Sequence, residues 1–180
     1  MEKPFFNKVA VLGLGLIGSS LCLLMKQEGL VGTIAGNARS QATLDTALEI
    51  GFIDSAHSSP TDAVKNADLI VLATPVGANK KIAEAISQSL KPGAIITDVG
   101  SVKVAVIRDV APCLPKGVHF VPGHPVAGTE HSGPTSGFPE LFANRYCILT
   151  PPEETDPKSV ALVRALWETA GSIVEIMDAA

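Results

Sequence analysis

Short apolar runs alternate with longer helix-like stretches along the chain, and this alternation predicts the fold class. Apolar runs typical of strands lie at Val9–Leu12, Gly32–Gly36, Leu69–Ala73, Ala94–Asp98, Val118–Val121, Tyr146–Thr150 and Ser172–Met177. Helices are expected at Ser19–Lys26, Ser59–Asn66, Lys80–Leu90, Pro157–Ala170 and in a segment that begins near Lys103. The strand runs show little polar alternation, as in strands covered on both faces. Strands that alternate with helices imply parallel pairing through right-handed crossovers, so we expect an α/β protein with a doubly wound, mainly parallel sheet.

The first expected strand and helix are joined by a glycine-rich turn in G-x-G-x-x-G spacing. Gly13 permits the turn, Gly15 lets the backbone approach a pyrophosphate, and Gly18 lets the helix pack against the strand. Leu16 and Ile17 open the helix, where free N–H groups and the helix dipole favour an anion. These features predict a Rossmann-type sheet that binds NAD or NADP. The alternative is a glycine-rich turn that binds no ligand.

Length and composition limit the classes of protein to which the chain can belong. The chain has 180 residues, of which 46% are hydrophobic, so residues 1–180 can form one dinucleotide-binding domain with a sizeable core. A net charge of −4 and the lack of a lysine and arginine cluster argue against nucleic acid. No apolar run is long enough to span a membrane and no signal peptide is evident, so we expect a cytoplasmic protein. Cys22, Cys113 and Cys147 are too far apart for metal-ligand spacing, and we expect structural thiols and no metal.

The segment after the second expected strand bears on the choice of cofactor. NAD-binding domains usually carry an acidic residue near this point, which holds the ribose hydroxyls of the adenosine. Here Ala38 and Arg39 occupy the expected place and Ser40 follows. An arginine can pair with a 2′-phosphate that an acid would repel, so we expect NADP in preference to NAD. The alternative is that Arg39 stacks on the adenine and discriminates nothing.

Two further strand ends carry residues that could contact the cofactor. Thr74, Pro75 and Val76 follow the third expected strand, where proline halts the strand and the backbone can turn beneath the nicotinamide ribose. A plain strand terminator is the alternative. The next strand ends in Thr97-Asp-Val-Gly-Ser-Val-Lys103, which contains Gly100. Taken alone, Asp98 or Ser101 is expected to cap the helix that begins near Lys103.

His124 is the candidate general base. It lies between a glycine and a proline directly after an apolar run, so we expect its imidazole at the carboxyl edge of the sheet on a constrained backbone. The alternative is a structural or surface histidine. His57, His119 and His131 have weaker settings. The stretch Gly123–Pro139 is too long for a simple connection, which is typical of a functional loop.

Several strings together resemble one enzyme family. They are Val11-Leu-Gly-Leu-Gly-Leu-Ile-Gly-Ser-Ser20, Ala73-Thr-Pro-Val76, Thr97-Asp-Val-Gly-Ser-Val-Lys103, Gly123-His-Pro-Val-Ala-Gly-Thr-Glu130, Ser132-Gly-Pro134 and Leu141-Phe-Ala-Asn-Arg-Tyr-Cys-Ile-Leu-Thr-Pro151. From about Val9 onward, the chain resembles the nucleotide-binding half of the prephenate and arogenate dehydrogenases of tyrosine biosynthesis. The resemblance implies oxidative decarboxylation of a cyclohexadienol with hydride transfer to NAD(P)+. It implies that His124 accepts the proton of the C4 hydroxyl, that Ser101 bonds to that hydroxyl or to His124, and that Thr129 and Glu130 line the substrate mouth.

The family also carries a helical domain after the nucleotide-binding half. The resemblance implies that this domain makes a homodimer and supplies cations for the substrate carboxylates. Because the chain ends at Ala180, we expect a fragment of a longer two-domain enzyme, which binds dinucleotide but turns over poorly. Two other functions remain open, a β-hydroxyacid dehydrogenase and a non-catalytic NADP-binding regulatory module. The Gly123–Glu130 string argues against the first, and the settings of Ser101 and His124 argue against the second.

Overall fold

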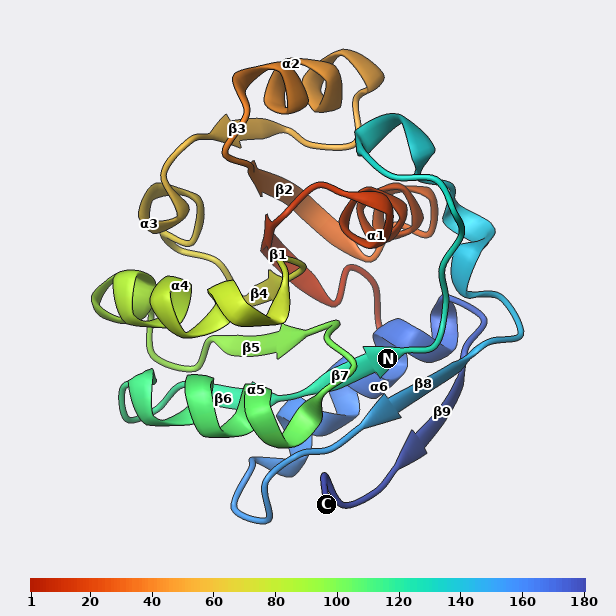
Figure 1. Cartoon of the computed structure of the whole chain (residues 1–180). Coiled ribbons are helices and arrows are strands. Elements are labelled where there is room, and N and C mark those ends of the chain that lie inside the picture. Colours follow the sequence, from red (N-terminus) through yellow and green to blue (C-terminus); the bar gives the residue numbers. More distant parts are fainter.

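The main sheet has the strand order of a dinucleotide-binding fold. A computed structural model describes residues 1–180 (Figure 1). Its parallel strands are β1 (Phe6–Leu12), β2 (Val31–Asn37), β3 (Ser55–His57), β4 (Leu69–Leu72), β5 (Ile95–Asp98) and β6 (His119–Val121). They lie in the order β3-β2-β1-β4-β5-β6, so the direction in which successive strands are added reverses between β1 and β4. The expected Rossmann-type sheet is confirmed, and ligands of such sheets bind at the carboxyl ends of the strands near this reversal.

Helices cover both faces of this sheet (Figure 1). They are α1 (Leu16–Gln27), α2 (Gln41–Ile50), α3 (Pro60–Ala63), α4 (Asn79–Ile86), α5 (Lys103–Val110) and α6 (Pro157–Thr169). Short 3₁₀ turns lie at η1 (Val76–Ala78), η2 (Ser87–Ser89), η3 (Ala111–Cys113), η4 (Pro134–Ser136) and η5 (Pro139–Phe142). On β1, Val9 and Val11 pack into a core with α1, α2 and α6, whereas Ala10 and Leu12 pack into a second core with α3, α4 and α5. This alternation explains why the strand is apolar at every position from Val9 to Leu12.

The last strands depart from the expectation of one doubly wound sheet. β7 (Gly123–Pro125), β8 (Tyr146–Leu149) and β9 (Ile173–Ile176) form a separate sheet, in which β7 and β8 are antiparallel and β8 and β9 are parallel. Pro122 has no N–H group to continue the β6 ladder, while its carbonyl oxygen accepts a hydrogen bond from Thr150 N at 3.0 Å. The chain therefore leaves the main sheet after Val121 and pairs next with β8.

Other differences from the expected elements are local. β3 was not expected, because its Ser-Ala-His sequence lacks the apolar character of the inner strands and lies at the sheet edge. α3 is shorter than the helix expected at Ser59–Asn66, and α1 begins at Leu16 rather than Ser19. Cys22 and Cys147 are buried free thiols, as expected, and Cys113 is a partly buried one. None of the helices is both long and apolar enough to cross a membrane.

Candidate functional site

A cleft of about 860 Å³ opens at the carboxyl ends of β1, β2 and β4. Seven of the residues predicted to bind a cofactor line it, namely Gly13, Gly15, Ala38, Arg39, Ser40, Thr74 and Pro75. Sequence reasoning missed other lining residues, among them Asn37, Thr43, Lys81, Gly133 and Pro134. These come from four separate segments, so no local pattern could have grouped them.

The glycine turn fits a dinucleotide pyrophosphate. Gly13 has a φ of +100°, and a Cβ atom there would lie 2.5 Å from the carbonyl oxygen of Ala73. The Cβ site of Gly18 is filled by the carbonyl oxygen of Gly13, so the helix packs tightly on the turn. In contrast, no atom lies within 4 Å of a Cβ placed at Gly15, which leaves its backbone open to a ligand. No side chain caps α1 and its first turn holds no acidic residue, so the N–H groups around Leu16 and Ile17 suit an anion.

The charged side chains that line the cleft are cations. β2 runs to Asn37, whose Nδ2 donates to the carbonyl oxygen of His57 at 2.9 Å, so a neutral amide stands where the strand ends. Arg39 follows, and Lys81 of α4 also lines the cleft. No aspartate or glutamate lines it. This charge pattern is the one that a ribose bearing a 2′-phosphate would prefer.

The predicted contacts near the nicotinamide divide into two groups. Thr74 lines the cleft, and its hydroxyl donates to the buried Asn79 Oδ1 at 3.1 Å, which holds the turn after β4. Val76 and Gly100 do not line the cleft. They pack on each other instead, since a Cβ atom at Gly100 would lie 2.7 Å from Val76 Cγ2. Ser101 is exposed and makes no hydrogen bond to His124 in this structure.

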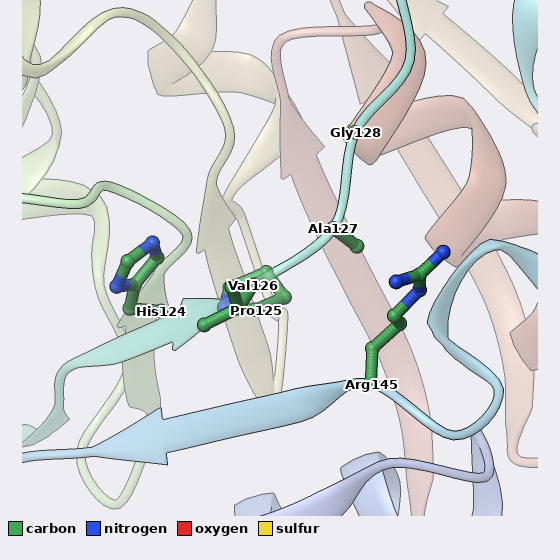
Figure 2. A pocket seen from close by; sticks show the side chains of 6 residues that line it. All are labelled: His124, Pro125, Val126, Ala127, Gly128 and Arg145. Carbon is green, nitrogen blue, oxygen red and sulfur yellow. The ribbon is translucent and has the colours of Figure 1, made fainter.

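A second cavity, of about 410 Å³, lies beside His124. Its lining consists of His124, Pro125, Val126, Ala127, Gly128 and Arg145, all drawn in Figure 2. Figure 2 shows His124 on β7 and Arg145 just before β8, with Pro125, Val126 and Ala127 between them. Thr129 and Glu130 follow this lining and are exposed, and Thr129 Oγ1 accepts a hydrogen bond from His131 N at 3.1 Å. Sequence reasoning did not single out Arg145.

The loop after β7 connects the two cavities. Gly128 lines the cavity beside His124, while Gly133 and Pro134 line the dinucleotide cleft. The loop is attached to α1, because Phe138 N donates to Ser20 Oγ at 3.1 Å. The expected functional loop therefore spans from the candidate base to the cofactor cleft.

A buried ion pair holds the peptide group that precedes His124. The carboxylate of Asp98 accepts hydrogen bonds from Lys103 Nζ, from Gly100 N at 2.9 Å and from Gly123 N at 3.1 Å. Lys103 Nζ also donates to the carbonyl oxygen of Gly123 at 2.7 Å. The pair thus binds both polar groups of Gly123. The expectation that Asp98 or Ser101 caps α5 is wrong, because Val102 occupies the cap position and no side chain bonds there.

Burial and charge set the protonation of this cluster. Burial raises the pKa of Asp98 and lowers the pKa of Lys103, while the charge of each partner opposes the shift in the other. Because three donors surround Asp98, the ionised pair satisfies its hydrogen bonds best. Partial burial lowers the pKa of His124 below its ordinary value of 6.5, and the Lys103 charge lowers it further, against a smaller opposing effect of Asp98. His124 is therefore neutral at pH 7, as a general base must be.

Comparison with known proteins identifies close relatives of this arrangement. Residues 21–176 match the family model described as the nucleotide-binding domain of prephenate dehydrogenase. The cyclohexadienyl dehydrogenase of Zymomonas mobilis is 39% identical over 174 residues, which is 97% of this chain and 59% of that protein. The chain spans about three fifths of the length of that relative.

Two solved structures extend the likeness to three dimensions. One is prephenate dehydrogenase from Aquifex aeolicus in complex with hydroxyphenyl propionate and NAD+, with a TM-score of 0.88 and 34% identity. The other is Synechocystis arogenate dehydrogenase, also with a TM-score of 0.88 and 34% identity. They are matched over 96% and 95% of this chain and over 60% and 59% of their own chains.

Proposed function

The chain belongs to the prephenate dehydrogenase family, and from this membership we propose that it takes part in the NAD(P)-dependent oxidative decarboxylation of prephenate or arogenate. The observation that carries the proposal is the place of His124. The Asp98–Lys103 pair holds the backbone of the preceding Gly123, and the side chain of His124 lines a cavity that one loop joins to the dinucleotide cleft. The resemblance also supports residues 1–180 as the dinucleotide-binding domain of a homodimeric, cytoplasmic enzyme of tyrosine biosynthesis.

The reaction removes a hydride from C4 of the substrate and a proton from the hydroxyl oxygen on that carbon. The dinucleotide that Gly13 and Gly15 would hold would supply the acceptor for this hydride. His124 accepts the proton of the C4 hydroxyl, and the resulting carbonyl draws electrons from the bond between C1 and the ring carboxylate. Carbon dioxide leaves, the ring becomes aromatic, and protonated His124 returns its proton to the phenolate oxygen. Atoms and charge therefore balance without another co-reactant.

The remaining predicted residues have supporting parts in this proposal. Ser101 follows β5 and is exposed, so its hydroxyl is free to bond to the substrate hydroxyl or to His124 once a substrate is present. Thr129 and Glu130 follow the lining residue Gly128, where they can contact the substrate at the mouth of the cavity. Gly13, Gly15 and the first turn of α1 would hold the pyrophosphate.

Product analysis tests the proposed reaction. We expect prephenate to give 4-hydroxyphenylpyruvate and arogenate to give tyrosine, each with one carbon dioxide and one reduced nicotinamide. Both substrates are assayed with NAD+ and with NADP+, and products are measured by chromatography. Oxidation of a β-hydroxyacid without release of carbon dioxide would reassign the chemistry. Tight dinucleotide binding with no turnover of any of these substrates would favour a regulatory module.

Cofactor preference provides the first prediction. We expect NADP+ to bind more tightly than NAD+, because Arg39 and Lys81 line the cleft and no carboxylate does. Arg39→Ala should weaken NADP+ binding about 10- to 100-fold, the scale of a hydrogen bond to a charged group at about 1.5–3 kcal/mol, and should change NAD+ binding little. Combining it with Ala38→Asp should move the preference toward NAD+.

Calorimetric titration of both dinucleotides measures this effect. Lys80→Ala is the matched control, because Lys80 is exposed on the same helix as Lys81 and does not line the cleft. A wild-type protein that binds NAD+ more tightly than NADP+ would refute the preference.

A further inference from the structure

Arg145 carries a charge that nothing in the chain neutralises. Its guanidinium makes no ion pair or hydrogen bond, although it lines the cavity beside His124 (Figure 2). Arg108 and Arg164 pair with Asp109 and Glu168, each with an N–O distance of 2.7 Å. The other unpaired arginine, Arg39, lines the dinucleotide cleft. Both arginines without a partner therefore face a cavity.

The backbone that carries Arg145 is held firmly in place. Arg145 N donates to the carbonyl oxygen of Phe142 at 3.2 Å, and its own carbonyl oxygen accepts from Ile173 N at 2.8 Å. The preceding Asn144 adopts a φ of +59°, and its N–H donates to Gly171 at 2.9 Å. Phe142 is buried edge-on against a tryptophan of α6, with the ring centroids 5.1 Å apart. An exposed guanidinium on so constrained a turn loses little backbone freedom when it binds a ligand.

The cavity combines two chemically different ends. His124 lies at one end and is neutral at pH 7, and Arg145 lies at the other as the one full charge of the lining. The lining between them consists of apolar side chains and backbone, with no carboxylate. The nearby Lys103 is buried and bonded to Asp98, so it is not available to a ligand. A volume of about 410 Å³ lies within the range of small-molecule sites.

We propose that Arg145 binds a carboxylate of the substrate while His124 faces the hydroxyl that is oxidised. The ligand class is a six-membered-ring acid with a hydroxyl on the carbon opposite the acid-bearing one. The inference rests on the proposed function for the identity of the substrate. It assigns a carboxylate-binding cation to residues 1–180, whereas the resemblance led us to expect such cations from a following helical domain.

A pair of matched ligands tests this assignment without turnover. The probes are 3-(4-hydroxyphenyl)propionate and 4-propylphenol, which share the ring and hydroxyl and differ in the carboxylate. Their dissociation constants are measured by calorimetry, with saturating dinucleotide, for wild type, Arg145→Met and Arg145→Lys. Arg164→Met is the control, because Arg164 is an exposed arginine on α6 that does not line the cavity.

Arg145→Met is expected to weaken binding of the acid about 10- to 100-fold and to leave the phenol unchanged. Arg145→Lys should restore part of the loss, since it keeps the charge but not the planar pair of donors. In steady-state assays, KM for prephenate or arogenate should rise by a similar factor, with a smaller change in kcat.

The outcomes separate this inference from the proposed function. Arg145 does not bind the carboxylate if the wild-type protein fails to bind the acid. The same conclusion follows if Arg145→Met weakens binding of the acid and the phenol equally, or weakens binding of neither. Turnover of prephenate with an unchanged KM in Arg145→Met would also overturn the inference and leave the proposed reaction standing. Arg145-dependent binding of the acid by a protein that oxidises neither substrate would preserve the carboxylate site and refute the reaction.

Discussion

Replacing His124 with asparagine is expected to lower kcat by about 10²–10⁴-fold, the usual contribution of a positioned general base. Asparagine keeps the approximate size and polarity of the side chain but cannot accept the hydroxyl proton. Dinucleotide affinity should not change, because His124 does not line the cleft that contains Gly13 and Gly15. The measurements are steady-state kinetics with the preferred substrate and titration of the dinucleotide.

The pH profile of kcat/KM gives a second readout of the same assignment. A base must be neutral to act, so activity should rise with pH through the pKa of His124 and then level off. Because burial and Lys103 lower that pKa, this acidic limb should lie below pH 6.5. Asp98 opposes this shift but does not cancel it.

The matched control is His131→Asn, which changes an exposed histidine of the same loop. Ser101→Ala should cost less than His124→Asn, because water can partly replace a hydroxyl that orients the substrate. If His124→Asn retains wild-type kcat and the acidic limb, the base lies elsewhere.

Breaking the buried ion pair is expected to produce the largest loss of stability. Lys103→Met leaves the carboxylate of Asp98 buried without its cation, and such losses amount to about 3–5 kcal/mol. The side chains of Asp98 and Lys103 are 0% and 6% exposed, so water cannot replace the missing partner. Urea denaturation should show this decrease in the free energy of unfolding.

The double variant Asp98→Asn with Lys103→Met is the control, because it removes both charges. It should be more stable than either single variant, because it leaves no unpaired ion, whereas each single variant leaves one. If the free energy of unfolding of each single variant lies within about 1 kcal/mol of the wild-type value, the fold does not require the ion pair.

The unpaired Asp98 carboxylate of Lys103→Met should also make the stability of this variant depend on pH. Burial already raises the pKa of Asp98, and loss of Lys103 raises it further. A carboxyl group with a raised native pKa binds more protons in the folded state, so its folded state gains stability as pH falls. The deficit of Lys103→Met should therefore be smaller at pH 5 than at pH 7. The acidic limb of its activity should also lie at higher pH, because the nearby positive charge has gone.

Local patterns in the sequence determined the main sheet and the cofactor cleft. The apolar runs and G-x-G-x-x-G spacing predict β1, β4, β5 and the tight turn into α1, because strand burial and glycine conformation depend on neighbouring residues. The Gly123–Glu130 segment also indicates the family, because it carries His124 in a distinctive sequence context.

The tertiary structure alone decided how distant segments combine around His124. Pairing of β7 with β8 brings Arg145 to the cavity, and no periodicity in either segment indicates that partner. Asp98 looks like a helix cap in sequence, yet burial against Gly123 and Lys103 gives its carboxylate three donors that the local helix could not supply. Hydrophobic patterns specify which residues are buried. Which buried or exposed polar groups meet depends on strand pairing and on the need of each buried charge for a partner, and both are settled only when the chain is folded.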